Sequence, residues 1–247
     1  MLTNALKKHI VSLKLKKHRV KNSQYIAEGD KIVTDLLAQY PTSVAKVIAT
    51  ADWLNANAKL LKSFQNEAVE VNDKELKKIS LLKTPNKALA LINIPPITAK
   101  INYANYDLTI VLDALQDPGN LGTIIRTADW FGIKNIVCST TCVDVYNPKV
   151  IQACMGSQMR VNVNYKNLTN LLTANNLPAY AAVLDGALLS ETKLTTPSFL
   201  VIGNESKGIS NEVVKLCSNK IKIPQLGGAE SLNAAVATGV ICAAFKL

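Results

Sequence analysis

Two polar residues, Asn120 and Arg126, lie six positions apart in a stretch whose sequence predicts a strand, a tight turn and a helix. Residues 109–112 form an apolar run, residues 117–120 read Asp-Pro-Gly-Asn, and apolar residues then recur at helical spacing. Asn120 falls near the start of the helix and Arg126 less than two turns later, so an amide and a guanidinium can face one crevice. Such a pair suits the orientation of a phosphate or a hydroxyl group. An Asn cap and a solvated Arg are the simpler alternative.

Two later stretches also read as a strand that runs into a loop. The first, FLVIGNESKGI at residues 199–209, places an amide and a carboxylate after its strand, in Asn204 and Glu205. The second, IKIPQLGGAESLNAAVATG at residues 221–239, has Ser231 where we expect the cap of the long final helix. Because open parallel sheets bind ligands at the carboxyl ends of their strands, we expect the three loops to converge at one edge. Taken singly, each is also compatible with an ordinary turn or helix cap.

The loops lack the glycine-rich motifs that bind phosphate groups. Gly227 and Gly228 make a loop that is free to adopt positive φ, and the first turn of the following helix offers backbone N–H groups. Backbone amides and apolar side chains of this kind can recognise an adenine ring. The sequence contains neither G-x-G-x-x-G nor a P-loop, the glycine-rich motifs that cradle phosphates. A dinucleotide-dependent or nucleoside-triphosphate-dependent enzyme is therefore disfavoured.

The three motifs, in the order N-x-G-x-x-x-R, G-N-E-S-x-G and I-P-x(7)-S-L-N, resemble those of the SpoU family of RNA ribose 2'-O-methyltransferases, in the SPOUT superfamily. The resemblance covers most of residues 106–247. It implies transfer of a methyl group from S-adenosylmethionine (AdoMet) to a ribose 2'-hydroxyl of ribosomal or transfer RNA. It also implies a deep C-terminal trefoil knot and a homodimer with sites near its interface.

The resemblance assigns roles to the positions of this chain that match the motifs. The residues that it implies for catalysis are Arg126, Asn120, Glu205 and Asn233. The residues that it implies for AdoMet binding, mostly through backbone groups, are Gly203, Asn204, Ile223, Leu232 and Ser231.

Arg126 is the residue that we expect to matter most for the chemistry. Only three of the 28 basic residues are arginine, so a guanidinium at this position suggests a need for a planar, bidentate donor. The mechanism that the resemblance implies has this arginine assist deprotonation of the 2'-hydroxyl. Since arginine stays protonated in proteins, we expect it to orient a phosphate and stabilise the developing alkoxide, with the proton leaving to a phosphate oxygen or water.

Strands and helices alternate through the C-terminal part of the chain, residues 107–247. The apolar runs predict strands at 108–113, 135–139, 161–165, 180–184, 198–202 and 220–223. Helical spacing predicts helices at 120–131, 148–157, 167–175, 211–217 and 231–246. This order predicts an α/β domain with a mostly parallel sheet that helices cover on both faces.

A smaller α/β domain is expected at residues 1–95, followed by a linker at 96–106 that begins with the second residue of the Pro95-Pro96 pair. Its expected strands are 24–29, 44–49, 68–71 and 87–94, with helices from 30 to 40, 53 to 64 and 73 to 82. In the SpoU family a domain in this position resembles an L30e-like fold and helps to hold RNA. The basic leader and the Glu28-Gly29 pair are similar to that domain.

The charge of the chain argues for a polyanionic partner. The formal net charge is +10, and residues 1–27 carry seven basic side chains and no acidic one. A basic block at a chain end suits contact with RNA phosphates, although a solvated amphipathic helix would show the same pattern. The RNA-binding candidates in this block are Lys16, Lys17, Arg19 and Lys21.

The cysteines and the hydropathy exclude several other classes of protein. The five cysteines contain no C-x-x-C pair and the two histidines lie far upstream of them, so no metal site is expected. Reduced, mostly buried thiols fit a protein of the cytoplasm. No apolar run is long enough to span a bilayer, and lysines interrupt the N-terminus too often for a secretory signal, so no membrane association is expected.

Two rival functions remain compatible with the sequence. A non-catalytic RNA-binding or ribosome-assembly protein could keep the same fold without turnover. A methyltransferase acting on a small molecule is disfavoured by the basic leader and the extra domain. Cofactor binding separates the first rival from the enzyme, and the salt dependence of RNA binding separates the second.

Overall fold

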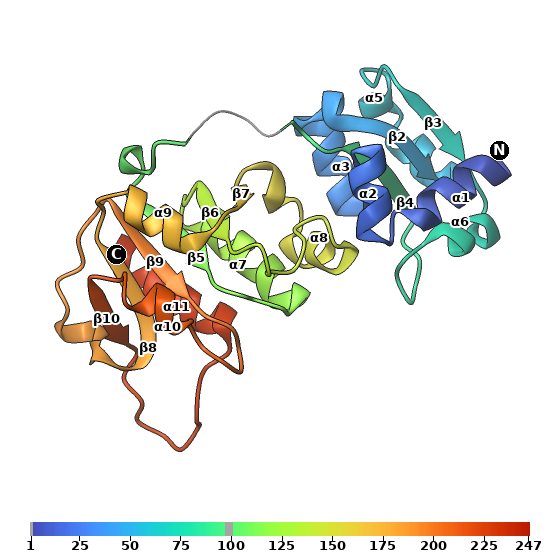
Figure 1. The fold of residues 1–247 in the computed structure, drawn as a ribbon. Helices are drawn as coiled ribbons and strands as arrows, with labels where there is room; N and C mark the ends of the chain where they lie inside the picture. The colour runs from blue at the N-terminus through green and yellow to red at the C-terminus, as the bar shows by residue number, and fades with distance from the viewer. Residues whose placement is uncertain (1, 97–100) are drawn as a thin grey trace. The chain divides into compact units, whose positions relative to one another are not determined.

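The structure, a computed structural model, describes residues 2–96 and 101–247, so the expected linker at 96–106 lies partly outside the described residues. The chain divides into two compact units (Figure 1). Unit 1 comprises Met1–Thr98 and Tyr146–Gly156, and unit 2 comprises Ala99–Val145 and Ser157–Leu247. Within the described residues, no helix combines the length and the apolar character needed to cross a membrane.

Unit 1 is built on a four-stranded mixed sheet in the order β1-β4-β2-β3. Strand β4 runs antiparallel to both of its neighbours, whereas β2 and β3 are parallel. Its elements before the linker are α1 (Asn4–Ser12), α2 (Lys16–Asn22), β1 (Gln24–Glu28), α3 (Asp30–Gln39), the 3-10 helix η1 (Pro41–Ser43), β2 (Val44–Ala49), α4 (Ala51–Ala56), α5 (Ala58–Leu61), β3 (Glu67–Glu70), α6 (Asp73–Ile79) and β4 (Ala88–Asn93).

The local sequence of unit 1 explains where its helices begin. Asn72 caps α6 and forms a capping box with Glu75, so the helix starts at Asp73, one residue earlier than a cap at Asp73 would place it. Gly29, at φ +128°, makes the turn between β1 and α3, and only glycine adopts that backbone conformation easily. The expected helix at 53–64 is two short helices, α4 and α5, that meet at Asn57.

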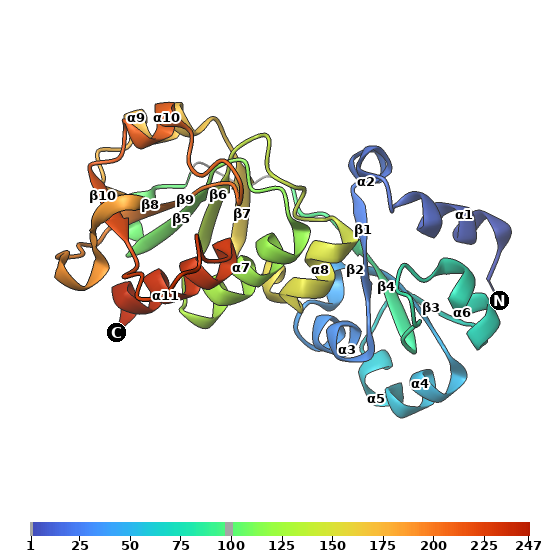
Figure 2. The ribbon, with the colours of Figure 1, turned by 90° about the horizontal axis from the view of Figure 1, so that it is seen from below.

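Helix α8 (Pro148–Cys154) belongs to unit 1 although the strands on either side of it belong to unit 2. It packs beside β1, as Figure 2 shows, and the rings of Tyr146 and Tyr25 lie 4.8 Å apart between their centroids. The helix ends before the expected residue 157 because Met155 adopts a left-handed conformation with φ of 52°. The sequence pattern predicted this helix but not the unit that contains it.

Unit 2 is built on a six-stranded sheet in the order β10-β8-β9-β5-β6-β7, and all neighbouring strands are parallel. Helices α9 and α10 cover one face, and α7 and α11 cover the other (Figure 2). The predicted α/β fold is therefore confirmed. Its elements are η2 (Tyr103–Asn105), β5 (Leu108–Leu112), α7 (Pro118–Trp130), β6 (Asn135–Cys138), η3 (Ser157–Met159), β7 (Asn162–Tyr165), α9 (Leu168–Ala174), β8 (Ala179–Leu188), η4 (Leu189–Glu191), β9 (Ser198–Ile202), α10 (Asn211–Val214), β10 (Asn219–Lys222) and α11 (Ala234–Lys246).

The core of unit 2 packs against the strands that carry the three motifs. On one face of the sheet, alternate residues of the central strands pack under α9 and α10, among them Val111, Val137, Phe199 and Val201. Strands β5 and β9, buried at every position, read as continuous apolar runs, as the central strands of a parallel sheet do. Each such buried side chain contributes about 1.5–3 kcal/mol, which holds the loops that follow β5 and β9 in place.

Candidate active site

The three motif loops meet at the carboxyl edge of the sheet in unit 2. The Nδ2 atom of Asn120, at the start of α7, donates to Oε1 of Glu205 at 2.8 Å. Nδ2 of Asn233, just before α11, donates to Oδ1 of Asn120 at 2.8 Å. These residues are 85 and 113 positions apart in the chain, so the convergence expected from the sequence is present in the fold.

The hydrogen bonds through these three side chains all run in one direction. The Oδ1 atom of Asn233 accepts from the backbone N–H groups of Ala235 and Val236 in the first turn of α11, at 2.9 and 3.3 Å. Asn233 then donates to Asn120, and Asn120 donates to Glu205. Aligned bonds of this kind polarise one another, which fixes the orientation of each amide. We call Asn120, Glu205 and Asn233 the polar chain.

Two further bonds tie the loop after β5 to the loop after β9. The buried carboxylate of Asp113 accepts the backbone N–H of Ser210 at 2.8 Å. Nδ2 of Asn204 donates to the carbonyl oxygen of Ala114 at 2.8 Å. Asp113 was not among the residues predicted for the site. The sequence feature that could have identified Asp113 is its position: it is a carboxylate directly after a buried strand, at the ligand-binding edge of the sheet.

Asn204 shapes the loop after β9. Its Oδ1 atom accepts the N–H groups of Ser206 and Lys207 at 2.9 and 3.1 Å, and its backbone N–H and carbonyl both pair with Gly208. Together with the bond to Ala114, these contacts use both ends of the side-chain amide inside the protein. The predicted cofactor role of Asn204 is therefore more consistent with building the loop than with direct side-chain binding.

Gly203 allows two backbone segments of this loop to approach each other closely. A Cβ atom at this position would lie 2.5 Å from the carbonyl oxygen of Gly208, and it would collide with the backbone between Gly208 and Ile209. The resemblance to the SpoU family assigns Gly203 to AdoMet binding through its backbone. The structure adds a second reason for glycine at this position, because the loop itself occupies the space in which a side chain would stand.

The loop from Pro224 to Asn233 is exposed along its whole length. The expected cap of the final helix, Ser231, is wrong: α11 begins at Ala234 and Asn233 is its cap. Ser231 and Leu232 therefore lie in the loop and not in the first turn of the helix. Leu232 is 49% exposed, which leaves an apolar side chain uncovered beside the polar chain. Ile223 is half-buried and directly follows β10.

Replacement of Asn233 with alanine is expected to lower both stability and AdoMet affinity. The cap of α11 would be lost, which costs about 1 kcal/mol, and Asn120 would lose the donor that orients it. Urea unfolding and calorimetric titration with AdoMet measure the two effects. Thr3→Ala removes a comparable cap, the bond from the Leu6 N–H in α1, without touching the polar chain. Equal AdoMet affinity of Asn233→Ala and Thr3→Ala would contradict the role assigned to Asn233.

Arg126 is exposed on α7 and is not joined to the polar chain by any hydrogen bond or ion pair among the described residues. Six residues separate it from Asn120, so the two side chains leave the helix about 120° apart. The sequence interpretation placed both in one crevice of the same chain, and this placement stays a prediction because no hydrogen bond joins the two side chains among the described residues. Arg126 instead shares a helical stripe with Trp130, four residues later, which is 85% exposed.

The second half of α7 is anchored through Asp129. Its Oδ2 atom lies 2.7 Å from Nη2 of Arg160, with which it forms an ion pair. The same atom accepts the hydroxyl of Ser157 at 2.8 Å. Burial opposes ionisation, but these two donors outweigh it and hold the pKa of Asp129 below its usual value. This anchor fixes the helix that carries Arg126.

Two thiols lie beneath the loop after β5. Sγ of Cys142 accepts the N–H of Leu115 and lies 3.2 Å from the carbonyl oxygen of Leu112. Its hydrogen bond with the Cys138 thiol lowers the pKa of Cys142 to about 7, against the opposing effect of burial. The same bond and burial raise the pKa of Cys138. The pair thus lowers the pKa of one thiol at the edge of the sheet that carries the site.

The free energy of unfolding is expected to decrease as the pH falls from about 8.5, the pKa of an unperturbed thiol, through about 7, the pKa of Cys142 in the folded protein. The thiolate of Cys142 is stabilised in the folded state, so its contribution is present above the unfolded pKa and is lost below the folded one. Urea unfolding at pH 8.5 and at pH 6 should show a smaller difference for Cys142→Ser than for the wild type. Cys217→Ser is the control, because burial raises the pKa of Cys217 to about 11. A wild-type difference no larger than that of Cys142→Ser would contradict the expectation.

The RNA-binding candidates divide into two groups. Lys16, Lys17 and Lys21 are exposed on α2 of unit 1. Arg19 is only 3% exposed, and its Nη1 atom donates to the carbonyl oxygens of Leu13 and Lys14 at 2.8 Å. Because burial and these bonds hold the guanidinium inside unit 1, the prediction of Arg19 as an RNA contact does not fit the structure.

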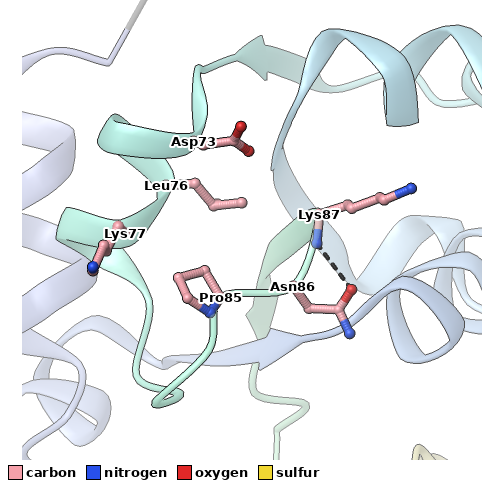
Figure 3. A pocket seen from close by; sticks show the side chains of 6 residues that line it. All are labelled: Asp73, Leu76, Lys77, Pro85, Asn86 and Lys87. Atoms are coloured by element: carbon pink, nitrogen blue, oxygen red, sulfur yellow. Dashed lines mark hydrogen bonds between the residues drawn. The ribbon is translucent and has the colours of Figure 1, made fainter.

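A surface hollow of about 250 Å³ in unit 1 offers poor ligand chemistry. It lies between α6 and the loop before β4, and in Figure 3 the side chain of Leu76 points into it while the amines of Lys77 and Lys87 point away. Among the residues that the structure describes, no cluster of three or more His, Cys, Asp or Glu side chains could hold a metal ion.

Comparisons with known proteins agree with this arrangement. Residues 107–243 match the SpoU rRNA Methylase family, and residues 4–90 match an MRM3-like substrate binding domain. The 23S rRNA (guanosine(2553)-2'-O)-methyltransferase RlmP of Bacillus subtilis is 28% identical over 93% of this chain and 91% of its own.

Two solved structures share the fold over nearly the whole chain. A TrmH-family protein from Porphyromonas gingivalis is 36% identical, with a TM-score of 0.86 over 100% of this chain and 98% of its own. An AdoMet-bound rRNA methyltransferase from Sinorhizobium meliloti is 27% identical, with a TM-score of 0.84 over 99% of this chain and 95% of its own. The resemblance that the three motifs suggested is confirmed, and the chain belongs to the SpoU rRNA methylase family.

Proposed function

We propose that this protein transfers a methyl group from AdoMet to a ribose 2'-hydroxyl of ribosomal RNA. The observation that carries the proposal is the polar chain, in which all three family motifs contribute a side chain to one edge of the sheet. RlmP, which matches over nearly its full length, is named for this reaction. The non-catalytic alternative receives no support from such relatives.

The residues beside the polar chain fit AdoMet. The exposed loop from Pro224 to Asn233 leaves open space around Gly227 and Gly228, where an added Cβ would meet nothing within 4 Å. Leu232 offers apolar surface for an adenine ring, and backbone groups at Gly203, Ile223 and Leu232 would hold the cofactor. Ser231 lies in the same loop and is assigned to the cofactor with them. Bound there, AdoMet supplies the electrophilic methyl group.

Arg126 supplies positive charge where negative charge develops. A guanidinium has five N–H donors and no acceptor, so Arg126 donates hydrogen bonds and does not act as the base. It orients a phosphate and stabilises the alkoxide that forms as the 2'-hydroxyl loses its proton to a phosphate oxygen or water. Asn120 and Asn233 orient the hydroxyl group, and Glu205 fixes Asn120 through the bond between them.

A homodimer with the C-terminal knot of the superfamily forms part of the proposal. Val236 and Val240 lie one turn apart on α11, are 52% and 41% exposed, and so leave an apolar stripe uncovered. Trp130 and Arg126 form a stripe on the neighbouring helix α7, so a second copy that covers the apolar surface would also lie against Arg126. Light scattering after gel filtration tests this, and Val236→Glu is expected to give monomers with impaired turnover.

The decisive experiment uses ribosomal RNA from a strain that lacks the gene for this protein. Incubation with the protein and isotope-labelled AdoMet is expected to add a methyl group to ribose at a single nucleotide, which mass spectrometry of nuclease fragments would locate. Retained RNA binding without measurable AdoMet binding would favour the non-catalytic reading instead. Transfer RNA from the same strain serves as the comparison substrate.

The exposed lysines of α2 are expected to contribute ionic contacts to RNA. A Lys16→Ala, Lys17→Ala, Lys21→Ala triple variant removes three cations, so the slope of log K against log salt should become shallower by about 2–3 units. Filter binding of ribosomal RNA fragments between low and moderate salt measures the slope. A variant that replaces three exposed lysines elsewhere in unit 1, namely Lys59, Lys62 and Lys74, is the control. An equal change of the slope in both variants would contradict a specific role of α2 in RNA binding.

A further inference from the structure

A second hollow in unit 1, of about 380 Å³, has the composition of a ligand site. It lies between β1, the segment after α6 and helix α8. Most of its wall is aliphatic, and the polar groups are few, which is typical of sites that bind small organic groups. The residues that line it are Ile26, Glu28, Leu81, Leu82, Lys83, Pro148, Lys149, Ile151, Gln152 and Ala153.

One wall of this hollow carries a buried carboxylate that is held in a fixed orientation. Glu28 is only 5% exposed. Its Oε2 atom accepts the backbone N–H of Leu81 at 3.0 Å, and its Oε1 atom accepts the hydroxyl of Ser80. Each carboxylate oxygen has about two acceptor positions, so each keeps one for a further donor. A ligand that presents N–H donors would use this capacity.

The opening of the hollow carries positive charge. Lys83 and Lys149 line it and are exposed, whereas Glu28 lies at the buried side. A ligand that fits both ends combines a flat apolar body, an N–H donor on its inner edge and an anion on its outer side. A nucleotide of single-stranded RNA has this combination, because its base is flat, its base edge can carry an amino group and its phosphate is anionic.

We propose that this hollow receives one unstacked RNA base that carries an exocyclic amino group, and that Glu28 selects it. The inference rests on the proposed function, since it names how the substrate binding unit would read its RNA. The base packs against Leu81, Leu82 and Pro148, which line the hollow and are partly exposed. Its amino group donates to Glu28, and Lys83 and Lys149 contact the flanking phosphates. Uracil is rejected, because it presents a carbonyl oxygen where cytosine presents the amino group.

The hollow beside α6 does not fit the same ligand. Its two lysine amines point away from the cavity in Figure 3, and its carboxylate, on Asp73, stands at the exposed start of α6. A base placed there would have no buried acceptor. The hollow between β1 and α8 is therefore the better site for binding a base.

The test compares two RNA probes that differ only at the group in question. Fluorescence anisotropy of labelled octacytidylate and octauridylate with the full-length protein is expected to show about tenfold tighter binding of octacytidylate. Glu28→Gln replaces one acceptor oxygen with a donor and is expected to abolish the preference. Ala153→Phe, which fills the hollow, should weaken octacytidylate binding to the level of octauridylate, and it keeps the proposal testable if Glu28→Gln does not fold.

Two variants outside the hollow serve as controls. Glu70→Gln and Ala56→Phe change exposed residues of the same unit and are expected to leave the cytosine preference intact. Equal binding of the two probes by the wild type, or an unchanged preference in folded Ala153→Phe, would overturn the base site. Methyl transfer to ribosomal RNA is measured separately. A loss of base preference with intact transfer rejects only this inference, and absent transfer rejects the proposed function.

Discussion

Replacement of Arg126 with lysine is expected to reduce kcat about 100- to 1000-fold while AdoMet affinity stays within about twofold of the wild type. Lysine keeps the positive charge but loses the planar fork of donors that stabilises a phosphate and an alkoxide together. Arg126 is exposed and lies outside the polar chain, so its replacement removes no bond that holds the cofactor loops. Single-turnover methylation of ribosomal RNA gives the rate, and calorimetry gives the AdoMet affinity.

A second arginine in unit 2 provides the matched control. Arg160 pairs with Asp129 and supports α7, but it makes no bond to Asn120, Glu205 or Asn233. Arg160→Lys is therefore expected to lower stability with only a modest change in kcat. If Arg126→Lys weakened AdoMet binding as strongly as it slowed transfer, Arg126 would be a cofactor-binding residue and the role assigned here would be wrong.

The strands that carry the site could be predicted because their sequences are unambiguous. Strands β5 and β9 are buried at every position, so each reads as a short apolar run that ends in polar residues or glycine. An alternating order of strands and helices makes a parallel sheet, and a parallel sheet brings its loops to one edge. The meeting of Asn120, Glu205 and Asn233 follows from that topology.

The details that could not be predicted depend on contacts between distant parts of the chain. Ser231 and Asn233 are both good helix caps, and the choice between them coincides with the bond from Asn233 to Asn120 across 113 positions. The direction of Arg126 depends on the rotation of α7 against α11, which helical spacing alone does not settle. Helical spacing alone puts Asn120 and Arg126 about 120° apart around α7, but it does not show which of the two side chains meets the other motif loops.

The composition of the basic leader did not show that one of its charged residues, Arg19, is buried and has a structural role. Arg19 lies among six other basic residues in the first 27 positions, so composition assigned it to the same surface as its neighbours. In the fold its guanidinium binds the carbonyl groups at the end of α1, which helical sequences leave without partners. A lysine in its place would reach fewer of these carbonyls because it lacks the planar fork.

Replacement of Gly203 with alanine is expected to destabilise unit 2 by about 3 kcal/mol and to weaken AdoMet binding at least about tenfold. The new methyl group would overlap the backbone of Gly208 and Ile209, and neither can move while Asn204 and Gly208 exchange their two 2.9 Å hydrogen bonds. Relief of the overlap would open this pairing and displace Glu205, which lies inside the loop. Urea unfolding and calorimetric titration with AdoMet measure the two effects.

Gly227→Ala is the matched control, because a Cβ there meets nothing within 4 Å and the backbone has no positive φ. It is expected to leave stability unchanged. The two variants add the same methyl group to neighbouring motifs, so their difference isolates the closed loop after β9 from any general effect of losing a glycine. If Gly203→Ala were as stable as Gly227→Ala, the close approach of the two backbone segments would not be needed, and the loop could hold Glu205 against Asn120 without it.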